Sequence, residues 1–170
     1  MMKKIAIAVL LLVGSGLASA EPGCSLDQLK ANSTTCDRNQ VSVQDKAAYV
    51  DFRVREVAGL QPDDVKSFLD SLKKAIESDD KAYLSDVAQY PLRYFESKKR
   101  GSVKGPAQFS KKYKVIFTDK IKRAIENQQY QDLFVNSEGI MLGNGEVWIS
   151  GIVENTTPPK TDIKIIAINN

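Results

Sequence analysis

The sequence contains no histidine, only two cysteines and a single tryptophan. The absence of histidine removes the commonest general base and metal ligand. It therefore excludes catalytic triads built on histidine and zinc sites that require it. No glycine-rich phosphate-binding loop is found: Gly101, Gly105, Gly139, Gly143 and Gly145 fall at expected turn positions, and no Lys-Ser/Thr helix start follows them. Carboxylates and tyrosines remain as the candidates for chemistry.

The first twenty residues have the pattern of a secretory signal. Lys3 and Lys4 form a positive start, residues 5–13 form an apolar run, and Ala18-Ser19-Ala20 is a small-residue cleavage site. The apolar run is too short to span a bilayer, which takes roughly 20 residues. The alternatives are an uncleaved anchor and a lipoprotein signal ahead of Cys24, but Glu21-Pro22-Gly23 does not resemble a lipobox. We expect cleavage after Ala20 and a periplasmic or secreted protein.

Export changes the charge balance of the chain. The full sequence has 24 basic and 21 acidic residues. Lys3 and Lys4 leave with the predicted signal, so the mature chain keeps 22 basic residues against 21 acidic ones, a net charge of +1. A near-neutral chain gives no reason to expect nucleic acid or a membrane surface as a partner. The local basic run Lys98-Lys99-Arg100 is interpreted as a solvated loop.

Two cysteines in an exported chain suggest one disulfide, between Cys24 and Cys36. The pair would close a short polar loop, and its spacing is far from that of a Cys-x-x-Cys redox motif. Residues 21–60 are interpreted as an extension tied by this bond, and residues 61–170 as the main domain. The extension is expected to contain a short helix at 26–30 and a strand at 48–57, although 44–57 would also tolerate a helix.

The clearest predicted helix spans residues 61–78. Pro62 suits its first position, and an apolar stripe follows at helical spacing. Asp79-Asp80 would break this helix and begin a shorter one that carries Tyr83, Leu84 and Val87. Two more helical stretches are expected after Pro106 and after Thr118. Strands are predicted at 90–96, 133–135, 140–142, 146–153 and 161–168. Helices followed by strands indicate an α+β fold.

A hairpin is predicted around Asn144-Gly145, because an Asn-Gly pair between apolar runs favours a type I′ turn. This turn would place Leu142 opposite Val147, Met141 opposite Trp148, and Ile140 opposite Ile149. One face then carries Ile140 and Ile149, and the other carries Met141, Trp148 and Ile152. The second face predicts an exposed apolar patch, for which a homodimer through the sheet is our preferred explanation.

The order of elements resembles the nuclear transport factor two-like superfamily, also called the cystatin-like α+β roll. The resemblance covers about residues 62–168. It depends on Tyr90-Pro91-Leu92-Arg93, on Phe109-x3-Tyr113-x2-Ile116-Phe117, and on Gly139-Ile140-Met141 followed by residues 143–148. It implies a curved antiparallel sheet wrapped around a long amino-terminal helix, with a cone-shaped cavity. That cavity is catalytic in some members, binds a ligand without chemistry in others, and elsewhere the open sheet face mediates dimerisation.

The aromatic side chains of this chain are candidates to line a pocket, with Arg93 available to an anionic group. The candidate pocket residues are Tyr90, Arg93, Tyr94, Phe109, Tyr113 and Phe117. Ordinary core packing explains the same aromatics and is the favoured alternative. Asp51, Asp132 and Glu138 are nominal acid or base candidates, but none lies in a recognisable motif.

The sequence therefore favours an exported, non-enzymatic binding or interaction module. Its partner would be an unknown small ligand in the cavity or a protein on the sheet face. We expect no cofactor and no metal. A periplasmic inhibitor or immunity protein is the first alternative, and an isomerase- or dehydratase-like enzyme is the second.

Overall fold

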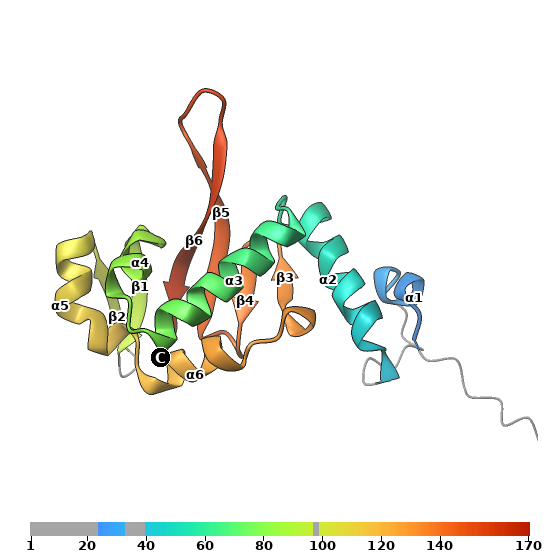
Figure 1. The fold of residues 1–170 in the computed structure, drawn as a ribbon, viewed down its shortest axis with the longest axis horizontal. Coiled ribbons are helices and arrows are strands. Elements are labelled where there is room, and N and C mark those ends of the chain that lie inside the picture. Colours follow the sequence, from blue (N-terminus) through green and yellow to red (C-terminus); the bar gives the residue numbers. More distant parts are fainter. Residues whose placement is uncertain (1–23, 33–39, 97–98) are drawn as a thin grey trace, which may run out of the picture.

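The computed structural model describes residues 24–32, 40–96 and 99–170. The signal segment and Cys36 lie outside these residues, so the cleavage site and the disulfide stay predictions. The described chain has an α+β fold with a curved, six-stranded sheet (Figure 1). None of the described helices is long and apolar enough to cross a membrane.

Two helices come first in the described chain. Helix α1 (Leu26–Lys30) begins with a capping box between Ser25 and Gln28. Helix α2 (Val43–Glu56) begins where the Ser42 hydroxyl accepts a hydrogen bond from the backbone of Asp45. Figure 1 shows both at one end of the molecule.

The predicted strand at 48–57 is wrong, because α2 covers these residues. Val50 and Val54 are four residues apart, so they share one face of the helix and are both buried in the main core. Phe52, between them, is only half-buried. The alternation of Val50, Phe52 and Val54 therefore concealed a helical spacing. The alternative of a helix at 44–57 is confirmed.

The central helix α3 (Pro62–Glu77) confirms the prediction at 61–78. Pro62 occupies its first turn, and Val65, Leu69 and Leu72 are buried along one stripe. The helix runs across one face of the sheet (Figure 1). The chain then turns at Asp79, whose φ is +51°, into α4 (Lys81–Asp86), capped by Asp80.

The sheet has the strand order β2-β1-β6-β5-β4-β3. The strands are β1 (Ala88–Glu96), β2 (Lys99–Val103), β3 (Phe134–Asn136), β4 (Gly139–Leu142), β5 (Val147–Glu154) and β6 (Lys160–Ile168). Between β2 and β3 lie α5 (Pro106–Ile116), α6 (Asp119–Asn127) and a short 3-10 turn, η2 (Tyr130–Asp132).

The prediction of an antiparallel sheet is wrong at one pair, because β1 runs parallel to β6. The β1–β2 hairpin is separated from the later strands by α5 and α6, and these helices return the chain so that β6 runs in the direction of β1. The other neighbouring pairs are antiparallel. The sheet is therefore mixed.

The hairpin register is confirmed, since Leu142 pairs with Val147, Met141 with Trp148, and Ile140 with Ile149. The type I′ turn is wrong. Positive φ angles fall on Gly143 (66°) and Gly145 (105°), and not on Asn144. The four-residue connection is closed instead by the Glu146 carboxylate, which accepts a hydrogen bond from the backbone N–H of Asn144.

The main core lies between the helices and one face of the sheet. Its sheet side includes Ile140, Leu142, Val147, Ile149 and Ile165, each at most 1% exposed. A second, smaller cluster joins Cys24, Leu29 and Val41 beside Tyr49. Beyond the core, β5 and β6 continue as a two-stranded arm that projects from the molecule (Figure 1). Val153, on this arm, is 68% exposed.

Candidate functional site

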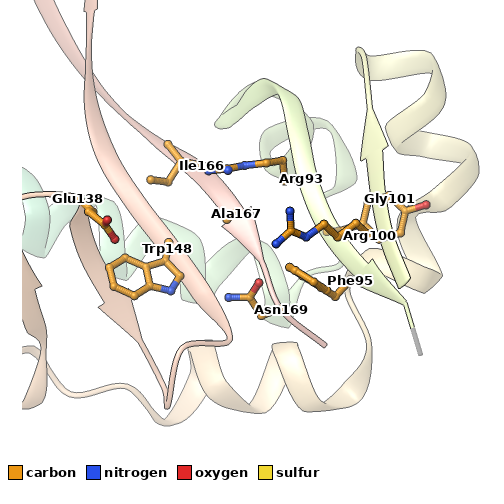
Figure 2. Close-up of a pocket in the computed structure, with 10 residues that line it drawn as sticks. Arg93, Phe95, Arg100, Gly101, Glu138, Trp148, Ile166, Ala167 and Asn169 are labelled. Carbon is orange, nitrogen blue, oxygen red and sulfur yellow. The ribbon is translucent and has the colours of Figure 1, made fainter. Parts of the chain in front are cut away.

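The opposite face of the sheet carries a groove of about 490 Å³ (Figure 2). Helices α3, α5 and α6 pack against the strands on the core face of the sheet, where the buried side chains lie. The groove lies over β2, β1, β6 and β5, and reaches the turn between β3 and β4. It is lined by Arg93, Tyr94, Phe95, Arg100, Gly101, Glu138, Trp148, Ile166, Ala167 and Asn169.

The alternation of side chains along β1 explains why basic residues lie at one end of the groove. On β1, Leu92 and Tyr94 are buried in the core, so Arg93 and Phe95 project from the outward face. Arg100 on β2 pairs directly with Phe95, and its guanidinium lies 5.8 Å from the centre of the Phe95 ring. This is a cation–π arrangement. Both arginines are exposed and extend over the groove (Figure 2).

Gly101 allows this strand pair to close tightly. It pairs with Tyr94, and a Cβ placed on Gly101 would overlap the phenol ring of Tyr94. The Tyr94 ring therefore packs over the glycine on the core face of the sheet. The strand β2 corrects the interpretation of Lys99 and Arg100 as a solvated loop. Basic side chains are common on exposed edge strands, so their polarity did not exclude a strand.

The apolar floor of the groove comes from an irregularity between β5 and β6. Trp148 pairs with Ala167, whereas Ile149 pairs with Ile165, which leaves Ile166 as an extra residue. Such a bulge redirects the side chain of the inserted residue. Ile166 consequently lies in the groove on the same side as Trp148 (Figure 2).

The charge of the groove is uneven. Arg93 and Arg100 supply two positive charges at one end, and among the residues that the structure describes no carboxylate forms an ion pair with either. Glu138 is at the other end, beside Trp148 (Figure 2). The Asn169 amide completes the lining, and its nitrogen donates to the Gly145 carbonyl at 2.6 Å. An anionic group would find unpaired guanidinium donors here.

The predicted pocket residues divide between two places. Arg93 and Tyr94 line the groove. Tyr90, Phe109, Tyr113 and Phe117 pack together on the helix side, with ring centres 5.4 to 6.4 Å apart in the pairs that touch. Phe109 is fully buried at the centre of this cluster. These four aromatics take part in core packing.

The three predicted interface residues all lie half-buried on the outward face or its extension. Trp148 lines the groove, whereas Met141 and Ile152 lie outside it. They belong to β4 and β5, so the patch runs along two neighbouring strands. The groove residues that sequence reasoning missed are Phe95, Arg100, Gly101, Ile166, Ala167 and Asn169. The alternation of Arg93 with Tyr94 could have indicated Phe95; the bulge at Ile166 leaves no sequence signal.

The nominal acid and base candidates are separated. Asp51 accepts a 2.7 Å hydrogen bond from the Tyr130 hydroxyl, and Lys66 lies 3.4 Å from the same carboxylate oxygen. A positive partner therefore balances the charge of Asp51. Asp132 and Glu138 are exposed. Within the described ranges, no cluster of His, Cys, Asp and Glu side chains could hold a metal ion.

A second tyrosine–aspartate pair joins Tyr113 on α5 to Asp79 in the turn between α3 and α4. The Tyr113 hydroxyl donates to Asp79 Oδ1 at 2.7 Å, and the Asp79 carboxylate also contacts Lys81 at 3.0 Å and Lys122 at 3.6 Å. The Tyr113 hydrogen bond and the lysines hold the pKa of Asp79 below its usual value. Burial and the Asp79 contact raise the pKa of Tyr113 well above that of a free tyrosine.

Comparison with known proteins returned no family model, no curated protein and no solved structure that matches this chain. The geometry of the groove therefore carries the functional argument.

Proposed function

We propose that the protein is an exported, non-enzymatic binding module whose ligand presents an anionic group to Arg93 and Arg100. One observation carries the proposal: two arginines with no carboxylate partner in the described chain meet over an aromatic and apolar groove. Guanidinium groups bind carboxylates and phosphates through paired hydrogen bonds. A flat apolar part of the ligand would lie against Trp148.

Three further points support this proposal. Export is expected from the signal pattern of residues 1–20. The non-enzymatic role is supported by the missing histidine and by the lysine that partners Asp51. The resemblance to the α+β roll superfamily is supported by the long helix α3 on the curved sheet (Figure 1). In contrast to the cone expected from that resemblance, the aromatic cluster at Phe109 belongs to the buried core, and the proposed ligand lies on the outward face.

The test uses Trp148, the only tryptophan in the chain, as a fluorescent reporter inside the groove. Phenylacetate should change its emission and bind more tightly than phenylacetamide, which has the same ring without the charge. The Arg93→Gln/Arg100→Gln double variant should lose about tenfold or more in phenylacetate affinity, since a charge-assisted bond contributes about 1.5–3 kcal/mol.

Lys99→Gln is the matched control, because Lys99 is an exposed cation on the same strand that does not line the groove. Equal affinity for phenylacetate and phenylacetamide would contradict the proposal. So would an arginine double variant that binds phenylacetate as well as the Lys99 control does.

A homodimer through the same face is the second candidate. It is favoured by Met141, Trp148 and Ile152, which are partly exposed apolar side chains on two neighbouring strands. Native mass spectrometry of the mature protein would report a dimer, which Trp148→Ser should convert to monomer. A monomer at all concentrations would remove this candidate and leave the groove open to a ligand.

A further inference from the structure

We infer that the ligand of the groove is a short peptide with a free amino group and a free carboxylate. This inference rests on the proposed function, since the peptide carboxylate would be the anionic group at Arg93 and Arg100. It adds a second recognition site for the opposite end of the ligand. Glu138 and Trp148 form that second site.

The charges of the groove are arranged as a dipole. The arginines extend from β1 and β2, and Glu138 lies at the far end with the Trp148 ring beside it (Figure 2). The Glu138 side chain is exposed and forms no ion pair within the described chain. A purely anionic ligand would meet repulsion from this carboxylate, whereas a ligand with a positive group at that end would be attracted by it.

An ammonium group suits this end for two reasons. It donates charge-assisted hydrogen bonds to a carboxylate, and it is attracted to the face of an indole ring. The backbone of Glu138 is fixed locally, because the Asn136 side-chain oxygen accepts hydrogen bonds from the backbone N–H groups of Glu138 at 2.9 Å and Gly139 at 3.1 Å. The negative group therefore starts from a defined position at the end of β3.

The strand order sets the length of the ligand. From β1 to β4 the sheet crosses β6 and β5, which makes three strand spacings of about 4.8 Å, or about 14 Å. The arginine side chains extend inward and shorten this gap. A free amino acid, whose two charges are separated by a single carbon, does not reach both ends. An extended peptide advances about 3.3–3.6 Å per residue, so about three residues span the groove.

The groove volume agrees with this length. Its volume of about 490 Å³ lies within the range of roughly 300–1,000 Å³ that is usual for small-molecule sites. The bulge residue Ile166 and the Trp148 ring provide an apolar floor under the middle of the peptide. In this proposal the recognition comes from the two charged ends of the peptide.

The experiment compares four probes by titration calorimetry: trialanine, N-acetyl-trialanine, trialanine amide and alanine. Trialanine should bind most tightly. Blocking either of its ends, or shortening it to alanine, removes one charge-assisted contact. Each change should therefore weaken binding about tenfold or more. Glu138→Gln should weaken trialanine binding to the level of its N-acetyl form, but it should not weaken phenylacetate binding, because phenylacetate loses only the repulsion of the carboxylate. Glu126→Gln, an exposed change on α6 away from the groove, is the matched control.

Equal binding of trialanine and its N-acetyl form, or an unchanged Glu138→Gln variant, would overturn the inference. An absence of trialanine binding would overturn it as well. The phenylacetate titration separates these failures from failure of the proposed function. If phenylacetate still depends on the arginines, the anionic site stands without the peptide; if it does not, both proposals fall.

Discussion

The Tyr130 hydroxyl donates a 2.7 Å hydrogen bond to Asp51, and Lys66 contacts both members of this pair. The lysine nitrogen lies 3.4 Å from the carboxylate and 4.8 Å from the centre of the tyrosine ring. The three residues belong to η2, α2 and α3, respectively. The pair therefore ties the early helices to the turn that leads into the sheet.

Tyr130→Phe should lower the free energy of unfolding by about 1–2 kcal/mol. The change keeps the ring under Lys66 but leaves the half-buried Asp51 carboxylate without its hydroxyl donor. Urea denaturation followed by circular dichroism measures the loss. Tyr49→Phe is the control. Tyr49 lies on α2, the helix that carries Asp51, and its hydroxyl forms no hydrogen bond within the described chain. Equal stability of the two variants would contradict the role of the Tyr130 pair.

Titration of the tyrosines at alkaline pH should reveal the hydrogen-bonded pair Tyr113 and Asp79. Burial first, and then the hydrogen bond to Asp79, raise the pKa of Tyr113 above its ordinary value of about 10. Because the pKa of Tyr113 is higher in the folded than in the unfolded protein, the protonated hydroxyl contributes to the free energy of unfolding. This contribution is complete below the pKa of the unfolded state and is lost as the pH rises through the pKa of the folded state. Asp79→Asn should therefore lower the pH at which the Tyr113 hydroxyl ionises, as measured by absorbance at 295 nm.

Asparagine is the right replacement because it tolerates the positive φ of 51° at this position. Asp119→Asn is the control, since Asp119 borders the same cavity as Tyr113 without bonding to it. A tyrosine titration curve that is the same in both variants would show that burial alone sets the Tyr113 pKa.

Gly101→Ala should destabilise the protein by about 1–3 kcal/mol and weaken phenylacetate binding. The added methyl would overlap the ring of Tyr94, which is buried and has little room to move. Gly105→Ala is the control, because nothing lies within 4 Å of a Cβ there and its φ of 171° is extended. Thermal unfolding of both variants measures the difference, and equal midpoints would show that the Tyr94 ring yields to the methyl group.

Local patterns predicted the elements of this fold better than their pairing. The apolar stripe of α3 and the Leu142–Val147 register follow from spacing alone. The parallel pairing of β1 with β6 does not follow from spacing, because it depends on how α5 and α6 return the chain. Val50 and Val54 suited a strand or a helix equally, and tertiary burial decided for the helix.

The groove was only partly predictable for the same reason. Arg93 and Trp148 are candidates in the sequence as single residues, but they line one groove only because β6 pairs with β5 on one side and with the distant strand β1 on the other. The basic run that contains Arg100 has glycines around it and therefore predicts a solvated loop, whereas Arg100 lies on β2. The extra residue Ile166 has no pattern of its own, because a bulge depends on the register of its neighbours.

Strand β6 joins two parts of the sheet that are formed from separate regions of sequence. On one side it pairs with β1, about seventy residues earlier, and on the other with β5. The β1–β2 hairpin and the β3–β5 meander can each form from near neighbours, whereas their union must wait for β6. Because closing long loops slows folding, we expect docking of β6 to be the late step and sheet completion to govern the folding rate.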